Sequence, residues 1–141
     1  MKTVLVAGGF DPLHIGHIQH FKEAKALGDV LVVAVNSDAD MVRKKGYCFM
    51  PHLERMEIIK AIKYVDRVIP VIDSDGSCAA TIMEVRPEIF AKGGDRNPKD
   101  NPIPQNEIDA CNRIGCEIVY GIGGGKVQSS SALTNAVLRK H

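Results

Sequence analysis

Two histidines three residues apart, His14 and His17, follow a pair of glycines at the end of a short apolar run. That run, residues 3–7, is β-branched and uncharged, as expected of a buried strand. The stretch after the histidines, residues 18–27, has apolar side chains at helical spacing. Backbone N–H groups at a helix start, and two imidazoles on one side of its first turn, would donate hydrogen bonds to phosphate. The arrangement predicts a phosphate site made by geometry rather than by a run of lysines.

Two more glycine turns follow predicted strands. The first is Gly93-Gly94, with Asp95 and Arg96 after it, and the second is the glycine-rich stretch 121–125. The second turn leads into a serine cluster at a predicted helix start, which suits either a simple helix cap or a phosphate cradle. The residues of this candidate cradle are Lys126, Gln128, Ser129, Ser130 and Ser131.

Several charged residues are candidates for neutralising phosphate charge. Lys44 and Lys45 form a basic cluster beside Gly46, which is either part of the site or a solvated turn. Arg55 lies on a predicted amphipathic helix, where it either contacts phosphate or pairs with a neighbouring glutamate. We expect Asp11 either to hold the glycine turn or to approach substrate.

Other chemistries fit the sequence less well. The patterns GxGxxG and GxxxxGK[ST] are absent, which counts against hydride transfer and P-loop chemistry. His20 continues the spacing of His14 and His17, but positions i, i+3 and i+6 drift around a helix and no HExxH follows. We therefore predict no protein-held metal site.

Strand and helix patterns alternate along the whole chain, which favours a Rossmann-like, doubly wound α/β fold with a five-stranded parallel sheet and a single domain over residues 1–141. In such sheets the ligand lies outside the carboxyl ends of the strands, and all three glycine turns follow strands at that edge. The expected strands are 3–7, 29–35, 67–72, 88–92 and 116–120. The expected helices are 18–27, 38–42, 51–62, 77–85, 105–114 and 132–139, with Leu53, Met56, Ile59 and Ile62 of the third facing inward.

Composition and charge limit the classes of partner that the chain is expected to bind. With 141 residues and a formal net charge of +1, the chain has no overall field that would recruit nucleic acid or an anionic membrane. It contains no apolar run of the roughly 18 residues needed to span a bilayer and no signal-peptide pattern. Its 4 cysteines lack CxxC spacing, so we expect reduced thiols in a cytoplasmic protein.

The string His14-Ile15-Gly16-His17, preceded by Gly9-Phe10-Asp11, resembles the HxGH signature of the cytidylyltransferase-like nucleotidyltransferases. The resemblance spans nearly the whole chain, and Lys92-Gly93-Gly94-Asp95 is most similar to the adenylyltransferase domain of ADP-heptose synthase. The string 64–69 is similar to glycerol-3-phosphate cytidylyltransferase. Arg96 differs from the aromatic residue of the heptose enzyme, and a glycine replaces the arginine of the family's R-T-x-G-x-S-T-T motif, which leaves Lys126 as the nearest cation.

The resemblance implies a reaction and a set of site residues. A phosphorylated alcohol or sugar would attack the α-phosphorus of CTP or ATP, and pyrophosphate would leave; Mg²⁺ would accompany the triphosphate, and a homodimer is possible. The implied catalytic residues are His14, His17, Lys44, Lys45 and Arg55. The implied nucleotide-binding residues are Gly8, Gly9, Phe10, Gly16, Gly93, Gly94, Asp95, Lys126, Gln128, Ser129, Ser130 and Ser131. Asp11, Lys44 and Arg96 would bind the acceptor. The alternatives are adenylyl transfer to pantetheine phosphate or flavin phosphate, and a non-catalytic nucleotide-binding module.

Overall fold

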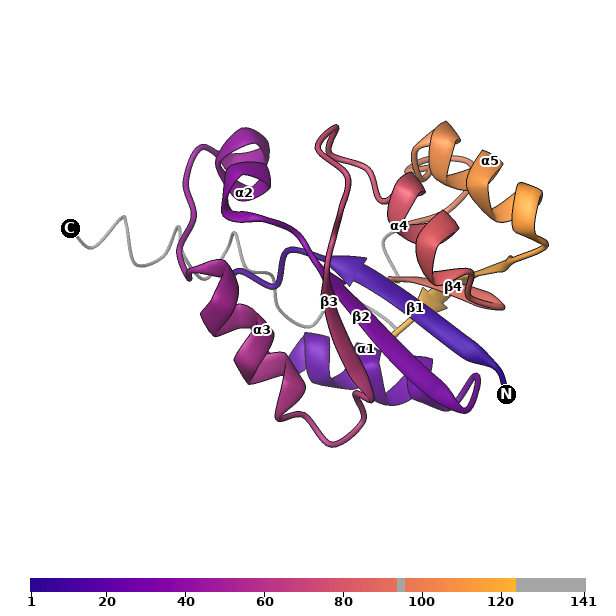
Figure 1. Ribbon diagram of the computed structural model, residues 1–141, viewed down its shortest axis with the longest axis horizontal. Helices are drawn as coiled ribbons and strands as arrows, with labels where there is room; N and C mark the ends of the chain where they lie inside the picture. The colour runs from indigo at the N-terminus through magenta and orange to yellow at the C-terminus, as the bar shows by residue number, and fades with distance from the viewer. Residues whose placement is uncertain (94–95, 124–141) are drawn as a thin grey trace.

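The computed structural model describes residues 1–93 and 96–123. Over these ranges the chain alternates between strands and helices, as Figure 1 shows. The strands are β1 (Thr3–Gly8), β2 (Val30–Val35), β3 (Arg67–Pro70), β4 (Ile89–Gly93) and β5 (Glu117–Ile122). The helices are α1 (Ile15–Lys25), α2 (Asp38–Lys45), α3 (His52–Lys60), α4 (Ala79–Val85) and α5 (Gln105–Ile114). The predicted final helix, 132–139, lies outside the described residues.

The strands form one parallel sheet in the order β3-β2-β1-β4-β5, which confirms the predicted Rossmann-like architecture. β1 is central and pairs with β2 on one side and β4 on the other. β3 is an edge strand and ends at Pro70, two residues before its predicted limit at residue 72, because proline cannot donate a ladder hydrogen bond. The strand order reverses between β1 and β4, so ligand binding is expected at their carboxyl ends.

Helices cover both faces of the sheet (Figure 1). On one face, Phe21 of α1 and Ile59 of α3 pack against alternate side chains of β1 and β2. On the other face, Ile82 of α4 and Cys111 of α5 pack against Leu5 and its neighbours. Strands buried on both faces explain the continuous apolar runs in the sequence. Over the ranges 1–93 and 96–123, every helix is too short or too polar to cross a bilayer.

Two helices differ from their predicted limits at the end nearest the candidate site. α1 begins at Ile15 rather than Ile18, because the His14 side chain caps it. α2 continues to Lys45 rather than ending at Val42, so Lys44 and Lys45 belong to a helical last turn and not to a mobile loop. Cations in that turn are favourable beside the partial negative charge of the helix end, and Gly46, at φ 84°, ends the helix.

The inward face of α3 differs from the predicted one at one position. Leu53, which was expected to be buried, is 77% exposed, whereas Arg55 is completely buried. Ile59 is buried, and Met56 and Ile62 pack against the core, as expected. Apolar spacing did not predict the buried Arg55, because it gives no weight to a guanidinium that is buried with hydrogen-bond partners.

Candidate active site

The candidate site lies where β1 ends and α1 begins, at the carboxyl edge of the sheet. The carboxyl end of β5 reaches the same place: a Cβ built on Gly123 would lie 3.3 Å from the Cα of His20 in α1. Gly93, at the end of β4, is joined to β5 by the register Gly93–Ile122. The three glycine turns therefore do leave neighbouring strands at one edge, as the sequence predicted.

The imidazoles of His14 and His17 lie against each other at the start of α1. Their ring centroids are 3.9 Å apart and the rings are inclined by 27°. His14 Nδ1 accepts the Gly16 N–H at 3.1 Å, and His17 Nδ1 accepts the His14 N–H at 3.2 Å. This reciprocal arrangement is a capping box built from two histidines.

The capping bonds determine which ring nitrogen carries the proton. A nitrogen that accepts an N–H is unprotonated, so each neutral ring has its proton on Nε2. They also bear on the sequence-based picture, in which the backbone N–H groups of the helix start bind phosphate directly. The Gly16 N–H is used by His14, and each imidazole carries a donor of its own at Nε2.

The buried ring of Phe10 packs against the ring of His17. Its ring centroid lies 5.0 Å from that of His17 and 5.3 Å from that of Phe21, in edge-to-face contacts. Phe10 is buried and has a positive φ of 53°, a backbone conformation that is rare for a residue with a side chain. The sequence suggested nucleotide contact for Phe10, and the structure places its ring in the core beneath the site instead.

Glycine is required at both positions before Phe10 because neighbouring side chains leave no space for a Cβ atom. A Cβ on Gly8 would lie 3.0 Å from the Phe10 ring, and one on Gly9 would lie 2.6 Å from Met41 Sδ. Neither glycine has positive φ, so space and not backbone conformation requires glycine at these two positions. Gly9 thus allows α2, which carries Met41, to approach the end of β1.

Asp11 ties the turn after β1 to the segment after α2. Its carboxylate is 1% exposed and accepts the N–H groups of Phe49 at 2.8 Å and Met50 at 2.5 Å. The Lys45 ammonium lies 3.2 Å from Asp11 Oδ2 and donates to its backbone carbonyl at 2.5 Å. The substrate contact suggested for Asp11 is therefore not what the structure shows. Lys45 in turn is held by Asp11 and lies over the Tyr47 ring, at 4.9 Å from its centroid.

The buried side chain of Arg55 connects three loops by hydrogen bonds to their backbone carbonyls. Its Nη1 donates to the carbonyls of Gly9 at 2.7 Å and Asn36 at 2.8 Å, and its Nε donates to Met50 O at 2.8 Å. Nη2 donates to Asp38 Oδ1 at 2.7 Å. The expected glutamate partner on the same helix is not used. Because the side chain is completely buried and satisfied within the protein, Arg55 acts as a positioning residue rather than as a direct phosphate contact.

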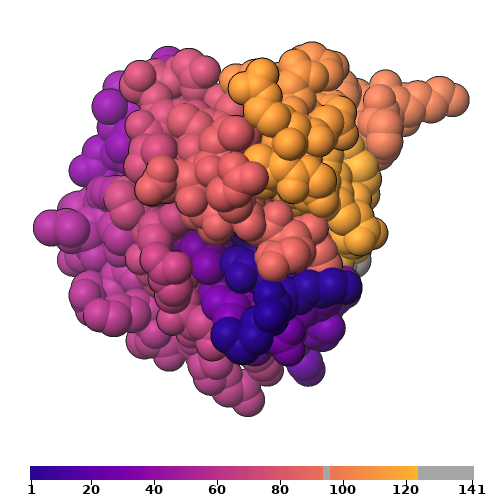
Figure 2. Space-filling view, turned by 45° about the vertical axis from the view of Figure 1, so that its right-hand side comes forward, coloured from indigo at the N-terminus to yellow at the C-terminus, as the bar shows by residue number. Residues whose placement is uncertain are grey.

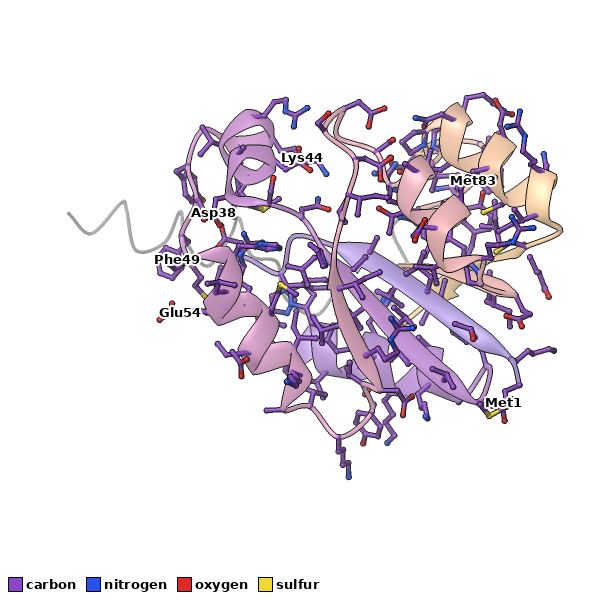
Figure 3. All side chains as sticks on the ribbon, in the orientation of Figure 1. Met1, Asp38, Lys44, Phe49, Glu54 and Met83 are labelled. Atoms are coloured by element: carbon purple, nitrogen blue, oxygen red, sulfur yellow. The ribbon has the colours of Figure 1, made fainter. Side chains whose placement is uncertain are left out.

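The Asp38–Arg55 pair is reflected in the pKa of Asp38. Partial burial raises this pKa, but hydrogen bonds from Arg55 and Cys48 outweigh that effect, and the pKa lies below its ordinary value. Figure 3 shows Asp38 on the side of α2 nearest Phe49 and α3, and Lys44 on the other side of the same helix. Of the two neighbouring lysines, Lys44 is the exposed one. Arg96 is half-buried and donates to Pro102 O at 2.7 Å.

Several predicted site residues cannot be located. Gly94, Asp95, Lys126, Gln128, Ser129, Ser130 and Ser131 lie outside the described residues. Among residues 1–93 and 96–123, no group of three or more His, Cys, Asp or Glu side chains is arranged to hold a metal ion. Sequence reasoning did not select Asp38 or Met41, which support the site; the serine–aspartate helix start at 37–38 was the only available signal for the former.

Comparison with known proteins identifies a family and several relatives with similar sequences. A family profile described as cytidylyltransferase-like matches residues 5–112. The bifunctional protein HldE of Cronobacter sakazakii is 41% identical over 101 residues, 70% of this chain and 21% of that protein. HldE of Vibrio vulnificus is 36% identical over 137 residues, 89% of this chain and 28% of that protein. The chain thus spans only 21% to 28% of the length of these relatives.

Solved structures show the same fold. The lipopolysaccharide core biosynthesis protein of Thermoplasma volcanium has a TM-score of 0.72 and 31% sequence identity, with 89% of this chain and 99% of that one covered. Thermotoga maritima TmcAL, bound with α-thio ATP, has a TM-score of 0.74 at 13% identity, with 99% of this chain and 51% of that one covered. At that identity the second likeness concerns the fold alone.

Proposed function

This chain belongs to the cytidylyltransferase-like family and is a nucleotidyltransferase, and we propose that it joins a nucleoside triphosphate to a phosphorylated sugar or small alcohol with release of pyrophosphate. Heptose 1-phosphate with ATP is the pair most in keeping with the HldE relatives. The observation that carries the proposal is the histidine pair, because both rings use Nδ1 within the protein and so have Nε2–H as their donor.

The reaction proposed is a direct displacement at phosphorus. An oxygen of the acceptor's phosphate attacks the α-phosphorus and forms a new P–O bond, while the bond to the bridging α–β oxygen breaks and pyrophosphate takes the electron pair. The nucleophile is already an anion, so the step needs neither a general base nor a covalent intermediate. Alignment and stabilisation of charge supply the catalysis.

Within this proposal, the residues have distinct tasks. His14 and His17 donate to triphosphate oxygens, and the exposed Lys44 neutralises charge. Lys45, Asp11 and Arg55 hold the loops that carry these groups. Mg²⁺ would be held mainly by the triphosphate itself and by water.

Pyrophosphate release tests the proposal. The protein is incubated with ATP or CTP, Mg²⁺ and one acceptor at a time: heptose 1-phosphate, glycerol 3-phosphate, pantetheine phosphate or flavin phosphate. We expect release with ATP and heptose 1-phosphate and none without acceptor. Release only with pantetheine phosphate or flavin phosphate would replace the sugar acceptor by a cofactor precursor. Binding of nucleotide without release in any mixture would contradict the proposed reaction.

A further inference from the structure

The last turn of α2 carries three consecutive cations, Arg43, Lys44 and Lys45, of which the middle one is exposed and the outer two are held by other segments. Lys45 is held at the turn after β1, where its ammonium donates to Asp11 O at 2.5 Å. Arg43 Nη1 donates to Ser74 O, in the segment after β3, at 2.8 Å. The two neighbours of Lys44 are therefore anchored to two different segments that leave the carboxyl edge of the sheet.

The guanidinium of Arg43 has a partner at each terminal nitrogen. Nη2 forms an ion pair with Asp40 Oδ1, one helical turn earlier, and Nη1 donates to Ser74 O. Asp40 is buried, so its charge needs a partner within the protein. Because a guanidinium is planar and rigid, the ion pair at one nitrogen fixes the direction of the other. The buried carboxylate thus directs Arg43 at Ser74.

The turn that accepts this hydrogen bond is fastened to α4. Asp73 accepts the N–H of Thr81 at 3.0 Å and its hydroxyl group at 2.7 Å. A Cβ built on Gly76 would lie 3.9 Å from Arg43 Nη1, which is an ordinary van der Waals distance. In Figure 1 the segment after β3 rises next to α2. The carbonyl of Ser74 is therefore held independently of α2 and can serve as its anchor.

α2 needs such anchors because it is short. It has 8 residues, too few for a helix that is stable by itself, so the direction of its last turn depends on contacts with the rest of the chain. Figure 3 shows Lys44 on the side of α2 that faces the segment after β3. A lysine side chain has many rotamers, so fixing the backbone on both sides of Lys44 limits the positions that its ammonium can reach.

We propose that Arg43 is a positioning residue, which holds the last turn of α2 through Asp40 and Ser74 O so that Lys44 is directed at the reacting phosphates. This inference rests on the proposed function, in which Lys44 neutralises phosphate charge. Charge stabilisation in a displacement at phosphorus depends on the alignment of cations that are already in place. Arg43 acts through Lys44 and not on the substrate.

A double-mutant cycle on pyrophosphate release tests the assignment. The full chain is compared with Arg43→Met, Lys44→Met and the double variant, with the nucleotide and acceptor that the parent protein uses. We expect kcat/KM to fall about tenfold in Arg43→Met and about 10²-fold in Lys44→Met. The double variant should match Lys44→Met to within about twofold, because Arg43 has no effect once Lys44 is absent. A merely structural role would lower kcat/KM equally in both backgrounds.

Arg113→Met is the matched control. Arg113 also lies in the last turn of a helix, is exposed, and forms no ion pair within residues 1–93 and 96–123. Figure 1 and Figure 2 both show α5 on the side of the molecule away from α2. Its kcat/KM should stay within about twofold of the parent value. If Arg43→Met does not fold because Asp40 loses its partner, Arg43→Met/Asp40→Asn takes its place in the cycle.

Hydrogen exchange gives a readout that does not depend on turnover. The Gly46 N–H donates to Val42 O at 2.8 Å and closes the last turn of α2. In Arg43→Met this amide should exchange about tenfold faster than in the parent protein, whereas the amides of α5 should not change.

Three outcomes would overturn the assignment. A kcat/KM of Arg43→Met within about twofold of the parent value would show that the anchor does not matter for the reaction. An equal fall with and without Lys44 would show that Arg43 does not act through Lys44. Unchanged exchange at Gly46 would show that Arg43 does not hold the turn. A parent protein that releases no pyrophosphate contradicts the proposed function itself, and the exchange measurement still decides whether Arg43 anchors α2.

Discussion

His14 and His17 cap each other: the side chain of His14 accepts an N–H from the first turn of α1, while the side chain of His17 accepts the N–H of His14. The same two bonds satisfy the backbone N–H groups of His14 and Gly16 and orient both rings. The same two side chains therefore cap the helix and carry the proposed donors to phosphate. Substitutions must be chosen to separate these two roles.

The substitution His14→Asn separates capping from chemistry. Asparagine is a good N-cap residue, so we expect the free energy of unfolding to change by less than about 1 kcal/mol. It lacks the imidazole donor, so kcat/KM should fall by about 10²–10³. His14→Ala should show the same loss of rate together with a further loss of stability of about 1 kcal/mol. Urea unfolding and pyrophosphate release measure the two effects; full activity of the asparagine variant would contradict the donor role.

Arg55→Leu tests the positioning role of the buried guanidinium. It leaves the carbonyls of Gly9, Asn36 and Met50 without their donor and removes the charge that faces Asp38. We expect a loss of about 3 kcal/mol in the free energy of unfolding. Asp38→Asn, at a half-exposed partner, should cost less than about 1 kcal/mol. Undiminished stability with lost turnover would instead make Arg55 a direct ligand contact.

Gly9→Ala tests the close approach of α2 to the end of β1. The added methyl group would lie 2.6 Å from Met41 Sδ, so the buried methionine must move, at a cost of about 1–2 kcal/mol. In a Met41→Ala background the same change should cost clearly less. Urea unfolding of all four proteins gives the coupling energy directly. Equal costs in the two backgrounds would show that Met41 is not the obstacle.

Asp66 gives stability a pH dependence. The hydrogen bond from Lys25, at 2.5 Å, and that from the Leu31 N–H lower the pKa of Asp66 below its ordinary 3.8. The unfolded chain therefore binds the proton more readily, so this stabilisation is present above about pH 4 and disappears as the pH falls through the folded pKa. Asp66→Asn should lower the free energy of unfolding by up to about 1 kcal/mol at pH 7 and by nothing near pH 2.

The control for this comparison is Asp100→Asn on the exposed 97–101 loop, which should leave stability unchanged at both pH values. A stability difference for Asp66→Asn that stays constant between pH 7 and pH 2 would show that the residue acts through its hydrogen-bond geometry and not through its charge.

Much of the fold could be predicted because local patterns and tertiary packing agree. α5 spans residues 105–114, as predicted, and ends at Gly115. The candidate site was found for the same reason, since parallel strands bring glycine turns that are distant in sequence to one edge. The histidine pair was recognisable because its spacing places both rings on one helical turn.

The failures have one physical cause: a polar group buried with partners looks, in sequence, like a surface group. Arg55 was expected either to contact phosphate or to pair with a neighbouring glutamate, but its partners are Asp38 and carbonyls from three loops. Asp11 was expected either to hold the glycine turn or to approach substrate, and it holds the turn by accepting N–H groups nearly forty residues away. The spacing of residue types along the chain does not indicate hydrogen bonds to backbone groups that are distant in sequence.

The position of β1 has a consequence for how the molecule comes apart. β1 is flanked by β2 and β4, and its residues Val4 and Leu5 are completely shielded from solvent. Amide protons at such a position exchange with solvent only when the entire domain opens, whereas those of the edge strand β3 exchange through local fraying. The turn that presents the histidines is rooted in the last part of the protein to open, so heat should abolish turnover and native structure in a single transition.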